Sequence, residues 1–136
     1  MDLIRLYENR SEREQIAFEG LIAAQLLAHK TATDAGWYIN PNTNAPIDRN
    51  VGEVIALMHS ELSEALEAYR KDLMDDKLTN RRGIEVEFAD CIIRIMDTAA
   101  AMGLDIAGAF IEKNRYNGMR ADHKLENRKK AGGKKF

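Results

Sequence analysis

GIEVEFADCIIRIMDTAAAMG, residues 83–103, has the pattern of an α-helix that is apolar on most sides. At about 100° of rotation per residue, its apolar side chains cover an arc of roughly 40° to 260°, measured from Glu87. One narrow polar stripe remains, and it consists of Glu87, Asp90, Arg94 and Asp97. A helix this apolar is expected to be buried within its own bundle and against a second subunit. Carboxylates on such a helix are costly to desolvate unless they are paired or bound to a metal.

A second helical segment, HSELSEALEAYRKD at residues 59–72, carries three glutamates at intervals of three. Measured from Glu61, most apolar side chains of this helix lie between roughly 40° and 140°, and Leu57 lies at about −40°. Glu61 therefore falls inside the apolar arc and Glu64 at its border, whereas Glu67 falls outside. Only Glu67 is expected to be a plain solvated residue.

The whole chain of 136 residues predicts one all-α domain, a four-helix bundle-like fold spanning residues 1–136. Helices are expected at about 11–34, 50–72, 83–102 and 105–118. Ser11 and Glu14 have the spacing of a capping box, and Asn50 and Asp105 are good N-caps. The loop GWYINPNTNAPIDRN, residues 36–50, is expected to be ordered because it carries aromatic side chains. A basic tail occupies about residues 121–136 and is expected to be solvated.

Composition limits the function classes. A net charge of −2 does not favour a nucleic-acid polymer as partner. The single cysteine, Cys91, excludes a disulfide within the chain and is expected to be a buried structural thiol. His29, His59 and His123 do not have the spacing of a zinc site. No apolar run approaches the roughly 18 residues that span a membrane, and the first residues lack a signal-peptide core, so a cytoplasmic protein is expected.

Two interpretations of the acidic stripes remain open on these grounds. In the first, the stripe at 87–97 is a solvent-facing edge, and Asp90 pairs with Arg94 at i,i+4. In the second, Glu61 and Glu64 converge with Glu87 and Asp90 between antiparallel helices. Mutual repulsion of four carboxylates would then be relieved by a hard cation such as Mg²⁺, with Mn²⁺ as a substitute, because both take oxygen ligands.

The motifs Glu61-x-x-Glu64 and Glu87-x-x-Asp90, in ELSE and EFAD, resemble those of a known family. Together with KNRYNGMR at 113–120, they make the chain similar to the all-α nucleoside triphosphate pyrophosphohydrolases, the MazG-like superfamily. GWYINPNTNAPIDRNVGE and the terminal GGKKF resemble a MazG-related branch of phage and bacterial genomes. The resemblance implies a homo-oligomer, either a dimer or a tetramer, with a dimer as the default because two-fold association is commonest.

The resemblance also implies an activity: Mg²⁺-dependent cleavage between the α and β phosphates of a nucleoside triphosphate, giving the monophosphate and pyrophosphate. Glu61, Glu64, Glu87 and Asp90 would be the metal ligands and catalytic carboxylates, with one of them, such as Glu61, orienting the attacking water. Lys113, Asn117 and Arg120 would hold the phosphates. Ser60 stands where some members have a further glutamate, which leaves the number of metal ions open.

Weaker candidates lie around this core. Trp37 stacks on a base, anchors its loop or packs against a second subunit. Gln25 and His29, one helical turn apart, could line a base pocket. Lys134 and Lys135 could fold over the phosphates or belong to a mobile tail.

Two rival functions are a phosphoribosyl-ATP pyrophosphohydrolase and a non-catalytic helical interaction module. The sequence leaves base and sugar preference open. One geometric difficulty remains. Glu61 lies far from the end of its helix, whereas Glu87 lies close to the start of the next helix, so a simple hairpin would not bring them level. The connection LMDDKLTNRRG at residues 73–83 must fold back, or the helices must cross, for the two motifs to meet.

Overall fold

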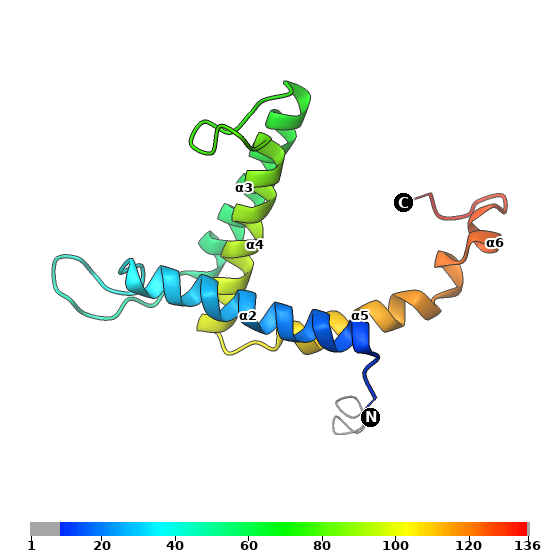
Figure 1. Cartoon of the computed structure of the whole chain (residues 1–136), viewed down its shortest axis with the longest axis horizontal. Helices are drawn as coiled ribbons and strands as arrows, with labels where there is room; N and C mark the ends of the chain where they lie inside the picture. The colour runs from blue at the N-terminus through cyan, green and yellow to red at the C-terminus, as the bar shows by residue number, and fades with distance from the viewer. Residues whose placement is uncertain (1–8, 136) are drawn as a thin grey trace. The chain divides into compact units, whose positions relative to one another are not determined.

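The computed structural model describes residues 9–135, and the regular secondary structure of this part of the chain is helical, with loops between the helices (Figure 1). Its elements are α2 (Glu12–Asp34), α3 (Val51–Arg70), α4 (Gly83–Ala101), α5 (Ile106–Met119), a 3-10 turn (Ala121–His123) and α6 (Leu125–Arg128). Between residues 9 and 135 there is no β-strand, only two isolated bridges. The four predicted helices are confirmed, each within two residues of its expected ends. Residues 1–8 lie outside the described residues, as does Phe136 at the end of the predicted tail.

The chain divides into two compact units, each of which is described by itself. Unit 1 combines the chain up to Ile22 with the chain from Asp105 onward, and unit 2 runs from Ala23 to Leu104. Helix α2 contributes its first half to unit 1 and its second half to unit 2. The single domain expected over residues 1–136 stays a prediction.

Helix starts follow the local signals in the sequence. Glu14 accepts a hydrogen bond from the Ser11 backbone N–H at 2.8 Å, while its own N–H donates to the Ser11 hydroxyl at 3.3 Å, which completes the predicted capping box. The side chains of Asn50 and Asp105 accept from backbone N–H groups three residues on, at 3.2 and 2.8 Å. These caps satisfy donors that a helix N-terminus leaves unpaired.

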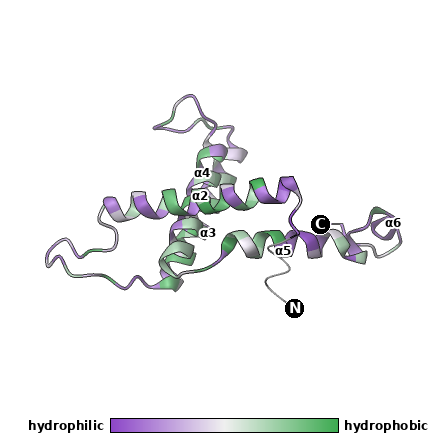
Figure 2. Ribbon diagram, turned by 60° about the horizontal axis from the view of Figure 1, so that its bottom comes forward, coloured by the Kyte–Doolittle hydropathy of each residue, from purple (hydrophilic) through white to green (hydrophobic). Residues whose placement is uncertain are grey.

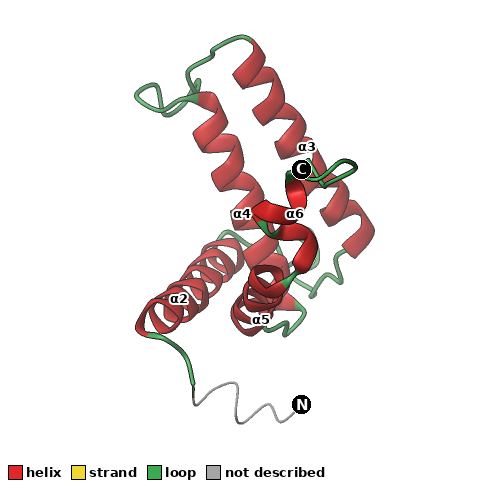
Figure 3. Ribbon diagram, turned by 90° about the vertical axis from the view of Figure 1, so that its right-hand side faces the viewer, coloured by secondary structure: helices red, strands yellow, loops and turns green. Residues whose placement is uncertain are grey.

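The centre of unit 2 is a hairpin of α3 and α4, which lie side by side and are joined by one loop (Figure 3). The core between them uses small side chains, which let the two backbones approach closely. Ala65 and Ala99 are each only 2% exposed, and the Cys91 thiol is buried and donates to the Met58 carbonyl at 3.6 Å. The prediction of a buried structural cysteine is confirmed.

The connection between α3 and α4 folds back on itself. Met74 and Arg82 form an antiparallel bridge, and the Gly83 N–H donates to the Leu73 carbonyl at 2.9 Å. Helix α4 therefore starts beside Ala68, inside the last turn of α3 rather than beyond its end. This back-folding brings Glu87 level with the acidic turns of α3 and removes the geometric difficulty.

Gly83, the first residue of α4, lies close against the end of α3. A Cβ atom at this position would lie 2.9 Å from the Ala68 Cβ and 3.2 Å from the Leu73 carbonyl oxygen. Gly83→Ala is therefore expected to lower the free energy of unfolding by about 1–3 kcal/mol through overpacking, measured by urea denaturation. Gly20→Ala is the matched control, because nothing lies within 4 Å of a Cβ at Gly20 in the middle of α2. This control should stabilise the protein by about 0.5–1 kcal/mol, and equal effects of both changes would contradict the close contact.

Many large apolar side chains are exposed in the single chain. Figure 2 shows how hydrophobic and hydrophilic residues are distributed along the helices. On α4, Phe88, Ile92 and Ile93 are each about half exposed, at 49%, 52% and 50%. On α3, Leu62 and Leu66 are 48% and 59% exposed. The predicted apolar arc of α4 is thus covered only in part by its own chain. None of the described helices is both long enough and apolar enough to cross a membrane.

Unit 1 is held together by an ion pair between α2 and α5. The Arg115 guanidinium donates to both carboxylate oxygens of Glu14, at 2.6 and 2.9 Å. This pair, together with the Ser11 cap, lowers the pKa of Glu14 to about 2. Arg128 of α6 donates to the carbonyls of Lys134 and Lys135, so the basic tail folds back on α6.

Candidate metal centre and adjoining cavity

Three carboxylates gather between α3 and α4. Glu61, Glu87 and Asp90 each place a carboxylate oxygen within 4.8 Å of the other two. Glu61 is only 6% exposed, while Glu87 and Asp90 are partly buried. Glu64 is exposed and does not belong to this group of three, although its charge still acts on Glu87. We call Glu61, Glu87 and Asp90 the carboxylate cluster.

Electrostatic repulsion in the cluster is visible in its pKa values. Burial, a hydrogen bond to Glu61, and the charges of Glu64, Glu61 and Asp90 raise the pKa of Glu87 to about 7. Burial and the charge of Glu61 also raise the pKa of Asp90, and the Arg94 charge opposes that rise only in part. The cluster therefore holds a proton close to neutral pH in the absence of other positive charge.

Arg94 pairs with Glu61 rather than with Asp90. Its Nε donates to the Glu61 carboxylate at 2.5 Å, across the hairpin from α4 to α3. The Asp90–Arg94 pair of the solvent-edge interpretation is not found among the ion pairs of the described residues. The stripe is instead turned toward α3, because its first two members face Glu61 and its third is bonded to it.

The ligand atoms suit a hard divalent cation. All three cluster members offer oxygen, which Mg²⁺ and Mn²⁺ prefer, and no histidine or cysteine of the described chain joins them. One Arg94 charge against three carboxylates leaves an uncompensated negative charge in a partly buried place, and a bound cation would neutralise it. Glu61, Glu87 and Asp90 therefore fit the cation that the resemblance implies.

A cavity of about 480 Å³ in unit 2 adjoins the cluster. Asp90 and Arg94 form part of its wall, so the cavity and the cluster share Asp90. The rest of the wall is mostly apolar, with Val54, Leu57 and Ile93 among its side chains. A volume of this size is in the range that accommodates a small organic ligand.

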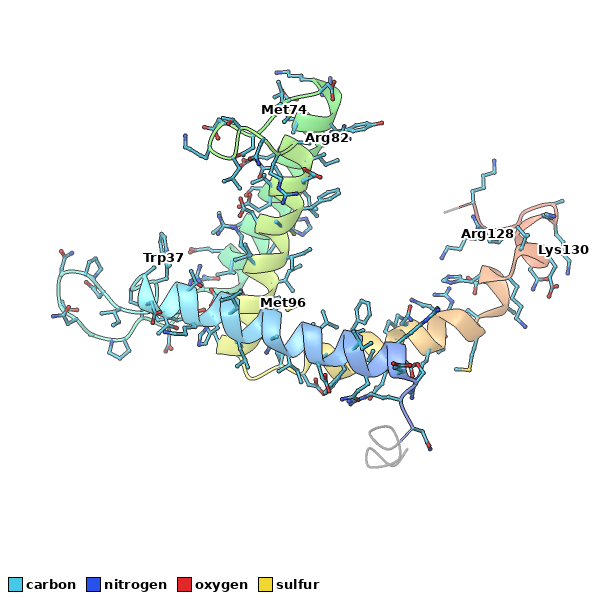
Figure 4. All side chains as sticks on the ribbon, in the orientation of Figure 1. Trp37, Met74, Arg82, Met96, Arg128 and Lys130 are labelled. Carbon is cyan, nitrogen blue, oxygen red and sulfur yellow. The ribbon has the colours of Figure 1, made fainter. Side chains whose placement is uncertain are left out.

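Trp37 lines the same cavity and is 67% exposed. Figure 4 labels it at the end of α2 where the following loop begins. An aromatic face beside an apolar cavity could stack on a ring, as predicted, and its exposure shows that Trp37 is not packed as a buried loop anchor. Base stacking itself stays a prediction.

Asp97 is the centre of a polar cluster that the sequence did not predict. It is 5% exposed and accepts hydrogen bonds from the Tyr38 hydroxyl at 2.7 Å, His29 Nδ1 at 2.9 Å and an Arg49 guanidinium nitrogen at 3.2 Å. Burial and the Asp97 carboxylate raise the pKa of Tyr38. We call these four residues the Asp97 cluster, which ties α2 and the loop at 35–50 to α4. The signal in the sequence was an aspartate next to Met96 on the apolar helix.

The base-pocket prediction for Gln25 and His29 gains no support from their contacts. His29 is bonded to Asp97, and the Gln25 amide donates to the Leu104 carbonyl at 3.1 Å. His29 lines a second cavity, of about 540 Å³, rather than the one that adjoins the carboxylate cluster. Both side chains therefore have bonds that stabilise unit 2.

The predicted phosphate-binding residues belong to unit 1. Lys113 Nζ lies 4.8 Å from the centre of the Tyr116 ring, and Arg120 pairs with Asp122 at 2.7 Å. Asn117 lies on the same helix, and its side-chain oxygen is buried without a hydrogen-bond partner. Lys134 Nζ lies 3.3 Å from His123 Nε2. That Lys113, Asn117 and Arg120 act together with the carboxylate cluster stays a prediction.

Comparisons of the chain with protein-family models, with curated proteins and with solved structures find no match. Functional inference therefore depends on the site itself and on the resemblance of its motifs.

The raised pKa of Glu87 predicts a pH dependence of stability. Folding raises this pKa from 4.5 to about 7. The contribution of protonated Glu87 to the free energy of unfolding is therefore complete below pH 4.5 and is lost as the pH rises through 7. In the presence of a chelator, the melting temperature should fall more between pH 5 and pH 8 for the wild type than for Glu87→Gln, which cannot titrate. Mg²⁺ should restore the wild type at pH 8. If the melting temperatures of the wild type and Glu87→Gln changed with pH in the same way, Glu87 would not be the cause of the pH dependence.

Proposed function

We propose that this protein is a Mg²⁺-dependent nucleoside triphosphate pyrophosphohydrolase with a MazG-like helical fold. One observation carries the proposal: three carboxylates from two helices lie within 4.8 Å of one another and share Asp90 with a cavity of about 480 Å³. If the acidic stripe only faced solvent, its carboxylates would not lie against a buried glutamate across the hairpin, because placing charges there costs free energy. The resemblance of ELSE and EFAD to the family's metal-binding motifs agrees with this placement.

In the proposed reaction, water attacks the α-phosphorus of the nucleoside triphosphate, and the bond to the bridging oxygen breaks to release pyrophosphate. Glu61, Glu87 and Asp90 would hold Mg²⁺, with Glu64 as the fourth carboxylate at the exposed side. The bound cation would neutralise phosphate charge and lower the pKa of the attacking water. One of these four carboxylates, through an oxygen that does not bind the cation, would accept the proton of that water. Trp37 and the apolar cavity wall would receive the base.

The uncovered apolar faces support the proposal of a homo-oligomer. Side chains on both α3 and α4 that are half exposed in the single chain are expected to pack against a second copy, because such faces are rare on monomers. A closed dimer is the default, since two-fold association is commonest. Sedimentation equilibrium measures this directly, and a monomer at all concentrations would contradict it.

The deciding experiment measures pyrophosphate release from a panel of standard and modified nucleoside triphosphates, with Mg²⁺ and with a chelator. Release of pyrophosphate and a monophosphate from at least one of them, only with Mg²⁺, is the expected result. Turnover of phosphoribosyl-ATP alone would favour the histidine-synthesis enzyme instead. No turnover of any substrate, together with no Mg²⁺ binding by calorimetry, would favour the non-catalytic interaction module.

A further inference from the structure

Arg94 has an unusual position for a residue beside a cation site. Its Nε donates at 2.5 Å to Glu61, which is the most buried member of the carboxylate cluster. Among the described residues it is the one basic side chain that forms an ion pair with the cluster. It also lines the 480 Å³ cavity, and 37% of its side chain is exposed. Arg94 is thus the internal counter-ion of the cluster.

A guanidinium and a divalent cation cannot both use the same Glu61 oxygen at full strength. Glu61 has two carboxylate oxygens, its side chain is 8% exposed, and Arg94 donates to Oε1. A cation held by Glu61, Glu87 and Asp90 would place two positive charges within a few ångströms of each other in a partly buried place. Their repulsion is strong where water is scarce. Binding of the cation is therefore expected to weaken the bond between Arg94 and Glu61.

The displaced side chain can turn toward the cavity that it already lines. Between residues 9 and 135 no other carboxylate is bonded to it, and 37% of its side chain is exposed. The planar guanidinium can donate two parallel hydrogen bonds to a phosphate group. A polyphosphate next to the cluster would thus meet a guanidinium that has just lost its previous partner.

We propose that Arg94 exchanges partners when the site is loaded: it neutralises Glu61 in the cation-free protein and binds a phosphate group of the substrate once a divalent cation takes its place. This inference deepens the proposed function and depends on it for the identity of the cation and the polyphosphate. It makes Arg94 both a competitor of the cation and a ligand of the substrate. Removal of the Arg94 charge must then strengthen binding of the cation and weaken binding of the substrate phosphate.

The test uses Arg94→Gln, Arg94→Lys and the control Arg70→Gln in the full chain. Arg70 lies on α3, its side chain is 70% exposed, and its one ion-pair partner within residues 9–135 is Glu67, at 4.0 Å. Two affinities are measured by calorimetry: Mg²⁺ alone, and inorganic triphosphate in excess Mg²⁺. Inorganic triphosphate carries no base, so the result does not depend on base preference.

For Arg94→Gln we expect Mg²⁺ to bind about threefold to tenfold more tightly and inorganic triphosphate about 10- to 100-fold more weakly. Arg94→Lys keeps the charge but loses the bidentate geometry, so its Mg²⁺ affinity should stay near that of the wild type while triphosphate binding weakens. Arg70→Gln should leave both affinities unchanged.

The outcomes separate this inference from the proposed function. If the wild type binds no Mg²⁺, both fail. If the wild type binds Mg²⁺ but Arg94→Gln binds it equally or less tightly, with an unchanged circular dichroism spectrum, only the partner exchange fails and Arg94 is a structural link between α3 and α4. In protein labelled with ¹⁵N-arginine, the Arg94 Nε–H signal should be protected from exchange without Mg²⁺ and lose protection when Mg²⁺ is added. Retained protection at saturating Mg²⁺ would also overturn the proposal, without any variant.

Discussion

Glu87→Gln is expected to reduce Mg²⁺-dependent pyrophosphate release by at least about 100-fold, since even residues that only orient metal ligands cost 10–100-fold when they are replaced. The substitution keeps the size of the side chain but removes the charge at the centre of the carboxylate cluster. Mg²⁺ affinity should fall in parallel, because an amide oxygen is a poorer ligand than a carboxylate. Asp90→Asn should act in the same way. Calorimetry with Mg²⁺ and a coupled pyrophosphate assay measure the two effects.

Glu67→Gln is the matched control for this prediction. Glu67 is on α3 within two turns of Glu61, but it pairs with Lys71 and Arg70 at the surface. Its replacement should change activity by less than about twofold, since surface ion pairs contribute little. The activity of Glu64→Gln should lie between those of Glu87→Gln and Glu67→Gln, because Glu64 is exposed yet acts on Glu87 through its charge. Equal activity of Glu87→Gln and Glu67→Gln would rule out the cluster as the reacting site.

Asp97→Ala is expected to be the most destabilising single change in unit 2, at about 2–4 kcal/mol by urea denaturation. The buried Asp97 carboxylate accepts from three side chains, so its removal leaves the Tyr38, His29 and Arg49 donors without an acceptor. Unpaired buried polar groups and a broken charge pair cost this order of free energy. Asp97→Asn keeps one acceptor oxygen and should cost about half as much. Asp34→Asn, at a residue 62% exposed in its side chain, should cost less than about 0.5 kcal/mol.

The same substitution should be visible at the cavity. Trp37 is the single tryptophan and adjoins Tyr38, which Asp97 holds, so its fluorescence reports on this loop. Asp97→Ala should shift the Trp37 emission at denaturant concentrations where the helical circular dichroism signal is still native. An emission spectrum identical to that of the wild type would show that the Asp97 cluster does not position the cavity wall.

The helices and their caps could be predicted because their causes are local. The Ser11–Glu14 capping box, the Asn50 and Asp105 caps, and the stop after Asp34 all involve residues within a few positions of one another. The convergence of Glu61 with Glu87 and Asp90 followed from helical periodicity plus a family resemblance. It met one obstacle, the unequal distances to the helix ends, which the fold-back at Leu73 and Gly83 resolves.

Other features could not be predicted, because they depend on which helix faces come together. From the sequence, Arg94 had an equally good partner at i,i−4 in Asp90, whereas in the structure it crosses to Glu61. The sequence placed Asp97 in the polar stripe but indicated no role for it. In the structure, α2 and the loop at 35–50 supply three donors that bond to its carboxylate. Glu64 lies at the border of the apolar arc, as periodicity predicts, but only the structure shows that it is exposed and outside the group of three carboxylates.

The sequence by itself determined the helical class, the helix ends and the pair of acidic motifs, since backbone hydrogen bonding, capping and side-chain periodicity act over one or two turns. Only the tertiary structure decided which charges are partners. Residues such as Glu61 and Arg94 are 33 positions apart, and their interaction exists only when α3 and α4 pack in one register. Gly83 and Ala68 contribute to that packing, because a Cβ atom at Gly83 would lie only 2.9 Å from the Ala68 Cβ.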